Sequence, residues 1–125
     1  MEYQRVKHIE NIQIPVRALD ESIAWYEQNL GFRLKGYGNK SLAFLQLNET
    51  NHVNLWQTDE DTTINFFKDG QAMPAFVMVT EHIERLYEDL NRTNTTIVAY
   101  SDEGFARGLK FLDPNGNLLL VLQYK

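Results

Sequence analysis

Residues 14–26 read IPVRALDESIAWY, and LGF follows at residues 30–32. Around this stretch, apolar and polar residues alternate over 9–16, which predicts a strand with one buried face. Apolar residues then recur at helical spacing from Asp20 onward, and acidic groups open this helix where its dipole is positive. Gly31 stands where a helix C-cap belongs. The stretch therefore predicts a strand followed by a helix.

The order of strand, helix and three strands occurs twice along the chain. After the first helix, the turn residues divide the sequence into three further strands, over 32–37, 41–48 and 52–57. The second half begins with a predicted strand at 75–80 and a helix at about 81–92, followed by strands near 95–100, 106–112 and 117–124. The last two strands flank the sequence FLDPNGNLLL (111–120), whose Asp-Pro-Asn-Gly core suits a tight turn.

The connection between the halves covers residues 58–71. It begins with acidic residues 59–61 and then carries Phe66 and Phe67, so we expect it to pack onto something and not to float free. The pattern predicts an α+β fold built from two βαβββ modules, with module one at about 6–57 and module two at about 72–125.

Composition narrows the functional classes. The 125 residues include 12 Lys and Arg against 17 Asp and Glu, a net charge of −5 without a basic cluster, so no nucleic-acid partner is predicted. There is no cysteine, which excludes disulfides and thiolate metal sites and fits a reducing compartment. No apolar run reaches the roughly 18 residues of a membrane helix, and no secretory signal is evident. We therefore expect a cytoplasmic protein without a membrane partner.

The two motifs at residues 14–32 and 111–120, in this order and spacing, resemble the vicinal oxygen chelate superfamily. That superfamily includes glyoxalase I, the extradiol dioxygenases, the fosfomycin-inactivating enzymes and the bleomycin-binding resistance proteins. The resemblance covers nearly the whole chain. It implies a single glyoxalase/bleomycin-resistance-like domain over 1–125, in which the two βαβββ modules form a curled mixed sheet around a cleft.

Metal-dependent members of that superfamily hold a divalent cation with His and Glu at four strand positions. The corresponding positions of this sequence carry Asn11, Asn54, about Ala75, and Leu120. Zinc, manganese, iron and nickel sites need imidazole or carboxylate ligands that converge at about 2.0–2.2 Å. Because two amides and two apolar side chains do not supply them, the sequence predicts neither a metal nor another cofactor.

Strand alternation predicts which side chains line the cleft. We expect Asn11, Gln13, His52, Asn54, Trp56, Leu118, Leu120 and Leu122. The fifth strand adds either Ala75 and Val77 or Phe76 and Met78, depending on its register. The alternative is that these side chains fill a closed core. An unpaired buried amide costs roughly 1–3 kcal/mol, which favours a cleft that water or ligand reaches.

Individual side chains leave alternatives open. Trp56 can stack on a planar or cationic ligand. His52 is either a partly buried histidine bonded to a backbone carbonyl, or a ligand-contacting or acid-base group and the only weak catalytic candidate. Arg107 either clamps a carboxylate or phosphate in the cleft or lies at the surface. Trp25 is expected at the edge of the core or against a dimer partner.

Two functional hypotheses follow from the resemblance. The first is a metal-free protein that binds a small organic molecule, such as an antibiotic or a metabolite, in the clefts of a homodimer, as bleomycin-resistance proteins do. The second is a glyoxalase-like lyase or isomerase, or a dioxygenase-related enzyme. It would use either a metal held by ligands other than the four aligned positions, or metal-independent acid-base chemistry through His52 and an acidic partner. A third class, a regulatory module acting on another protein, has no exposed apolar helix or charged tail to support it.

Overall fold

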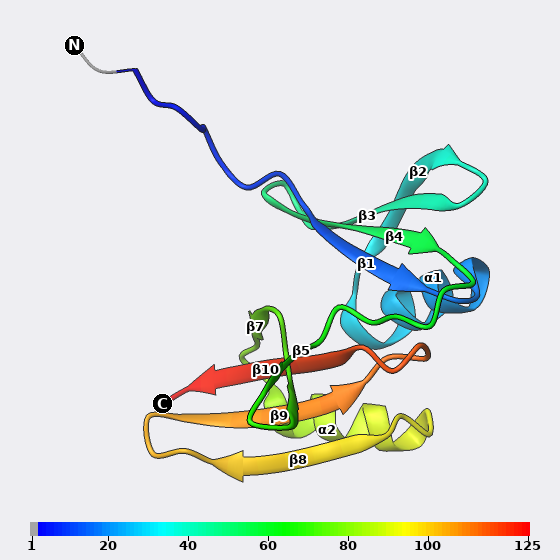
Figure 1. Ribbon diagram of the computed structural model, residues 1–125. Coiled ribbons are helices and arrows are strands. Elements are labelled where there is room, and N and C mark those ends of the chain that lie inside the picture. Colours follow the sequence, from blue (N-terminus) through cyan, green and yellow to red (C-terminus); the bar gives the residue numbers. More distant parts are fainter. Residues whose placement is uncertain (1–2) are drawn as a thin grey trace.

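The computed structural model describes residues 3–125 and confirms an α+β fold of two modules (Figure 1). The first module contains β1 (Ile12–Val16), α1 (Leu19–Leu30), β2 (Arg33–Asn39), β3 (Leu42–Asn48) and β4 (Asn51–Gln57). The second contains β7 (Val77–Val79), α2 (Ile83–Arg92), β8 (Ile97–Asp102), β9 (Ala106–Leu112) and β10 (Leu118–Tyr124). A small hairpin, β5 (Phe66–Lys68) and β6 (Gln71–Met73), lies between them.

The two sheets have the same topology. The first runs β1-β4-β3-β2 and the second β7-β10-β9-β8, so the first strand of each module occupies an edge. That strand pairs in parallel with the last strand of its module, and the other neighbours pair antiparallel. In each module, the connection between these two parallel strands runs through the helix and the two intervening strands.

Neither helix has a side-chain cap from its own N-cap residue. In both helices, a glutamine side chain from another element caps the N-terminus instead. The amide of Leu19 donates to Oε1 of Gln57 at 2.8 Å, and the amide of Ile83 donates to Oε1 of Gln123 at 2.8 Å. Each glutamine belongs to the last strand of its module and satisfies an otherwise unpaired N–H group. At the other end of α1, Gly31 adopts the left-handed conformation (φ 80°) of a C-cap.

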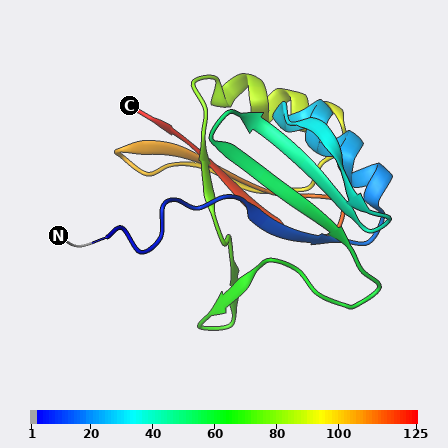
Figure 2. The same cartoon turned by 90° about the horizontal axis from the view of Figure 1, so that it is seen from above.

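The modules share one hydrophobic core on the helix-covered faces of the sheets. In Figure 2, α1 and α2 lie on one side of the molecule, and they contact each other. Trp25 of α1 packs on Tyr26 and on Phe111 of β9, with ring centroids 4.9 and 6.1 Å away, and its Nε1 donates to Thr95 at 3.2 Å. The opposite face of each sheet is left without a helix, and we call it the open face.

A buried polar network joins the two motifs found in the sequence. The hydroxyl of Tyr26 donates to Oδ2 of Asp113 at 2.7 Å, and both residues are buried. The side-chain amide of Asn117 also donates to Oδ2 of Asp113 at 2.7 Å and reaches the carbonyl of Pro15 at 2.9 Å. Burial and the negative charge of Asp113 raise the pKa of Tyr26 well above its usual value. The network fixes α1 and β1 to the turn before β10.

Several elements differ from the sequence predictions, among them β8, which was predicted near 95–100 and spans Ile97–Asp102. The first strand begins at Ile12 and not at residue 9, because its pairing with β4 starts there. The strand predicted at 75–80 is reduced to Val77–Val79, and the connection holds a hairpin that was not predicted.

No helix within residues 3–125 is long and apolar enough to cross a membrane.

Candidate functional site

The open face of the first sheet brings together the polar residues predicted from strand alternation. Gln13 of β1 lies opposite Asn54 of β4 in the parallel register. Its Oε1 accepts hydrogen bonds from Nε1 of Trp56 and, at 3.5 Å, from Nδ2 of Asn54. One glutamine therefore orients the indole and the amide together, so the site is partly organised before any ligand arrives.

An aromatic surface surrounds this amide group. Trp56 is 38% exposed, and Phe44 of β3, which pairs with Asn54, is also 38% exposed. Gly38 of β2 supports this surface, because an added Cβ would lie only 2.5 Å from Leu42 and 2.9 Å from Phe44. The absence of a side chain at Gly38 therefore leaves room for the side chains of Leu42 and Phe44.

A depression of about 420 Å³ adjoins the aromatic surface. Its polar lining comes from three strands and the segment before β1: Glu10, Asn11, Lys35, Gln46, His52 and Asn54. Glu10 contacts His8 at 2.8 Å, and this hydrogen bond, with the nearby His8 charge, lowers the pKa of the Glu10 carboxyl. The depression thus offers one carboxylate, one ammonium group and several amides to a ligand.

His52 lies at this depression with its Nε2 3.0 Å from the carbonyl of Glu49. This hydrogen bond matches the first alternative drawn from the sequence, a partly buried histidine satisfied by backbone. The acidic residue in the lining of the same depression is Glu10, which is paired with His8. The geometry holds the ring in place and leaves Nδ1 as its free nitrogen.

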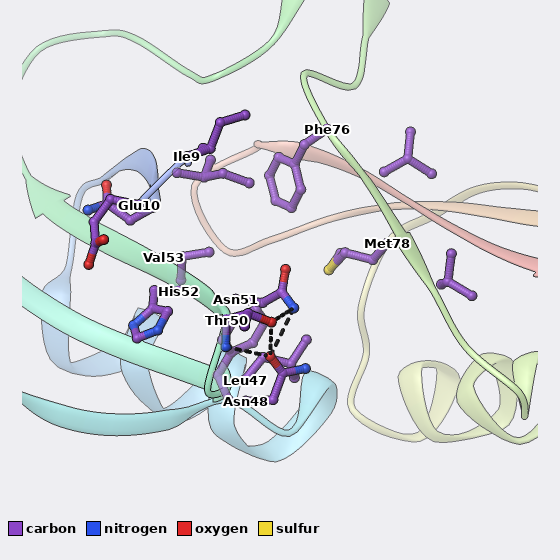
Figure 3. A pocket seen from close by; sticks show the side chains of 15 residues that line it. Ile9, Glu10, Leu47, Asn48, Thr50, Asn51, His52, Val53, Phe76 and Met78 are labelled. Carbon is purple, nitrogen blue, oxygen red and sulfur yellow. Dashed lines mark hydrogen bonds between the residues drawn. The ribbon is translucent and has the colours of Figure 1, made fainter. Parts of the chain in front are cut away.

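A second cavity, of about 520 Å³, lies between the modules (Figure 3). The first module lines it with residues 9–12, Phe32 and the end of the β3–β4 hairpin, and the second with residues 76–79. We call it the crevice. Its walls are mainly apolar: Phe32, Leu47 and Val53 on one side and Phe76, Met78 and Val79 on the other. Figure 3 shows His52, Val53 and the polar turn at Asn48–Asn51 across the gap from Phe76 and Met78. Of the residues predicted to line the cleft, five line this cavity: Asn11, His52, Phe76, Val77 and Met78.

The predicted leucines of the last strand lie on the second sheet. Leu119 and Val121 belong to the shared core, so Leu118, Leu120 and Leu122 alternate onto the open face. In β7, Val77 pairs with Leu120, and Met78 pairs with Val121. In this register Val77 is on the open face, whereas Phe76 and Met78 pack against the core, and all three line the crevice.

Arg107 and Trp25, which the sequence also identified as candidates, lie away from Gln13 and Asn54. Arg107 shares the helix-covered face of the second sheet with Leu109 and donates to the hydroxyl of Tyr100, with its guanidinium 5.0 Å from the ring centroid. Tyr100 in turn stacks on Tyr87 of α2 at 4.5 Å. Trp25 occupies the core edge described above, which agrees with one of its two predicted positions.

Sequence reasoning did not single out Phe44, Gln46 or Lys35. Phe44 and Gln46 alternate onto the open face in β3, and Lys35 reaches it at a register irregularity in β2. The alternation of residues 41–48 could have identified Phe44 and Gln46. They pair with Asn54 and His52 across the antiparallel strands and therefore lie on the same face. The irregularity at Lys35 leaves no comparable pattern in the sequence.

The donor groups at the four family positions do not fit a divalent cation. Asn54 is 8% exposed and already donates to Gln13, Leu120 has no donor atom, and Ala75 precedes β7 with only a methyl side chain. Within residues 3–125, no three His, Asp or Glu side chains gather as a metal site would require. No step of a metal-assisted reaction can therefore be assigned to these residues.

Comparison with known proteins places this geometry in a family. The family model of the Glyoxalase/Bleomycin resistance protein/Dioxygenase superfamily matches residues 5–121. None of the curated proteins matches the chain in sequence.

Solved structures share the fold at low sequence identity. An antibiotic-binding protein from a Streptomyces species is 14% identical, with a TM-score of 0.76 and coverage of 98% of this chain and 100% of that one. The fosfomycin resistance protein of Mesorhizobium loti is 11% identical, with a TM-score of 0.74 and coverage of 96% and 94%. Lactoylglutathione lyase from Agrobacterium tumefaciens is 14% identical, with a TM-score of 0.71 and coverage of 96% of both chains. At these identities the likeness concerns the fold alone. The family model, however, spans nearly the whole sequence. The chain therefore belongs to the Glyoxalase/Bleomycin resistance protein/Dioxygenase superfamily.

Proposed function

We propose that this protein binds a small organic molecule without a metal, on the open face of the first sheet, and works as a homodimer. The ligand class is a planar aromatic compound with polar substituents. Such a molecule stacks on the aromatic surface of Trp56 and Phe44 and exchanges hydrogen bonds with the amides of Gln13 and Asn54.

The observation that carries the proposal is the link from Gln13 to Trp56 and Asn54. The indole of Trp56 is partly exposed and is held in one orientation by a hydrogen bond. This arrangement of a large aromatic side chain suits a surface that a ligand covers. Orienting it in advance reduces the entropy lost when a ligand binds. Asn54 occupies one of the four positions at which the family resemblance places metal ligands, and Gln13 is bonded to it, so the same place in the fold would serve for hydrogen bonding.

The family supports the ligand class in general terms. Among the structural neighbours are an antibiotic-binding protein and a fosfomycin resistance protein. Antibiotic binding is therefore a role that one structural neighbour has, and we extend it in this proposal to sequestration of an antibiotic or a metabolite. The homodimer is supported by the open faces, which no helix within residues 3–125 covers. It is also supported by Phe66 and Phe67, which are 50% and 69% exposed on the hairpin.

The test is a fluorescence titration with a panel of planar aromatic compounds, neutral and cationic. A ligand that stacks on Trp56 quenches or shifts its emission, and Trp56→Phe removes the response and weakens binding. Trp25→Phe is the matched control, because Trp25 is enclosed by Tyr26 and Phe111. A response that follows Trp25 and persists in Trp56→Phe contradicts the proposed site.

The enzyme hypothesis depends on His52 and is tested separately. If the protein catalyses a lyase or isomerase reaction through this ring, His52→Ala abolishes turnover, whereas ligand affinity changes little. If it only binds, His52→Ala leaves ligand affinity within about threefold, because Nε2 is already committed to Glu49. A lost reaction with retained affinity would make the enzyme the better account.

A further inference from the structure

The hairpin of β5 and β6 projects from the body of the protein. Its two strands pair with each other and with no other strand of residues 3–125. Residues 66–72 are all exposed, and in Figure 2 the green hairpin stands apart from both sheets. An isolated two-stranded hairpin is marginally stable in water, so we expect its tip to open far more readily than the core.

The tip of this hairpin is the dipeptide Asp69-Gly70. The two residues have φ angles of 52° and 79°, as the central positions of a type I′ turn require. The side chain of Asp69 is 86% exposed, and Oδ2 contacts Nζ of Lys68 at 2.9 Å. Such an exposed ion pair restrains the carboxyl group little. Within residues 3–125, no hydrogen bond holds the amide N–H of Gly70.

A free carboxyl group beside a free glycine amide is reactive toward its own main chain. The nitrogen of Gly70 attacks Cγ of Asp69, with no Cβ in its way. The new C–N bond closes a five-membered imide, and one carboxyl oxygen leaves as water with the amide proton and the carboxyl proton. Water then attacks the main-chain carbonyl carbon of Asp69 and breaks its bond to the Gly70 nitrogen. The chain now continues through Cβ and Cγ, as isoaspartate, and the atoms are the same as at the start.

The sequence holds one other dipeptide of this kind, Asn115-Gly116. In an unstructured chain near neutral pH it is the faster of the two, because a neutral carboxamide is a better electrophile than an ionised carboxylate. The fold holds both of its reacting groups. The amide of Gly116 donates to the carbonyl of Asp113 at 3.1 Å. Nδ2 of Asn115 donates to the carbonyls of Pro15 and Thr62 at 3.3 and 3.2 Å.

These bonds tie the dipeptide to two distant parts of the chain. Asn115 also belongs to the turn whose Asp113 carboxylate is buried and bonded to Tyr26. The nitrogen of Gly116 therefore reaches the side chain of Asn115 only after the turn between β9 and β10 has opened, and several hydrogen bonds must break together. The tip of the β5–β6 hairpin has no such requirement.

We propose that Asp69 is a site of spontaneous isoaspartate formation in the folded protein, and that the fold reverses the intrinsic order of the two dipeptides by protecting Asn115. This chemistry requires neither the ligand nor the homodimer of the proposed function.

The product changes the hairpin. It adds one carbon to the main chain between Lys68 and Gln71, which pair across the turn. A two-residue turn fixes the register of its strands, so the longer connection shifts β5 against β6 and displaces Phe66 and Phe67. The surface that these aromatic side chains form therefore changes with the age of the molecule.

Heavy-oxygen water tests the wild-type chain, because each opening of the imide adds one solvent oxygen at the reacting residue. The folded protein is kept in this water near neutral pH, below its melting transition. It is then digested and analysed by mass spectrometry with fragmentation that separates isoaspartate from aspartate. We expect isoaspartate and label at residue 69, and more label there than at residue 115. In urea we expect the opposite order.

The variant Asp69→Asn removes the difference in side-chain chemistry, since both dipeptides then read Asn-Gly. This pair also favours a type I′ turn, so the hairpin is retained. In the folded variant, we expect residue 69 to lose its amide at least tenfold faster than residue 115, because only residue 115 must first open a bonded turn. In urea, the two rates should agree within about threefold. Circular dichroism confirms that the variant is folded during the incubation.

Three results overturn the inference. The first is an absence of label at residue 69 in the folded wild-type chain, which would mean that the tip does not open. The second is an equal rate at the two residues in folded Asp69→Asn, which would mean that the bonds to Pro15 and Thr62 give no protection. The third is a tenfold excess at residue 69 that persists in urea, because the fold would then not be its cause.

Discussion

Replacing Tyr26 by Phe removes one hydroxyl from the network that joins the two motifs. That hydroxyl donates to the buried carboxylate of Asp113 at 2.7 Å, and the side-chain amide of Asn117 remains as the other donor to Oδ2. A hydrogen bond to a charged group contributes about 1.5–3 kcal/mol. We therefore expect Tyr26→Phe to lower the free energy of unfolding at pH 7 by about that amount.

The expected shift of the melting temperature follows from the size of the chain. For 125 residues, the unfolding entropy is about 0.26 kcal/mol per kelvin, so 1.5–3 kcal/mol corresponds to roughly 6–11 °C. Urea unfolding followed by circular dichroism gives the free energy, and a thermal scan gives the temperature. Tyr37→Phe is the matched control, since Tyr37 is 55% exposed, and its change should stay within about 0.5 kcal/mol.

The same substitution changes the alkaline stability. The pKa of Tyr26 is raised in the folded state, chiefly by burial and then by the charge of Asp113, so the folded protein keeps a proton that the unfolded chain loses near pH 10. Stability therefore falls by about 1.4 kcal/mol per pH unit above pH 10, until the folded pKa is reached. Tyr26→Phe should lack this contribution to the slope. An unchanged stability at pH 7, or a wild-type alkaline slope in the variant, would refute the role given to the network.

Three further substitutions test the site. Gln13→Leu removes the acceptor of the Trp56 indole, and we expect a threefold to tenfold loss of ligand affinity with a shift in Trp56 emission. Gly38→Ala places a Cβ 2.5 Å from Leu42, so urea unfolding should show a loss of about 1–3 kcal/mol. Leu120→Glu alone should not create a metal site, because the other three positions still lack suitable donors, and calorimetry with zinc should show no stoichiometric binding.

Controls for these substitutions are available in the same sheets. Gly108→Ala places its Cβ 3.4 Å from the nearest side chain, an ordinary contact, so its cost should be clearly smaller than that of Gly38→Ala. Equal costs would mean that Leu42 and Phe44 move aside freely. A Gln13→Leu variant with unchanged affinity would mean that the indole is held by something else, and stoichiometric zinc in Leu120→Glu would mean that the metal positions were wrongly assigned.

The sequence predicted the elements whose patterns are long. Helix α1, its left-handed C-cap at Gly31 and the turn at 113–116 were confirmed, because helical spacing, glycine and the Asp-Pro-Asn-Gly run are local signals. The hairpin at residues 66–73 was missed because each strand has only three residues, too few for alternation to be recognised.

Contacts between distant residues were not predictable from local patterns. Alternation placed Gln13 and Trp56 on one face, but their hydrogen bond depends on the parallel register of β1 with β4. The link of Tyr26 to Asp113 crosses 87 positions of the chain and has no local signal. Arg107 was considered for the cleft, and its strand parity places it on the helix-covered face beside Tyr100.

The measurement that tests the central claim most directly is the metal content of the purified protein, prepared without chelator and without an affinity tag. The donor groups of Asn11, Asn54, Ala75 and Leu120 lead us to expect no stoichiometric metal, even after incubation with zinc, nickel, manganese or ferrous iron. Ligand binding measured on the same sample should then be unaffected by chelator. One equivalent of a transition metal per chain, with ligand binding lost on its removal, would contradict a metal-free site on the open face of the first sheet.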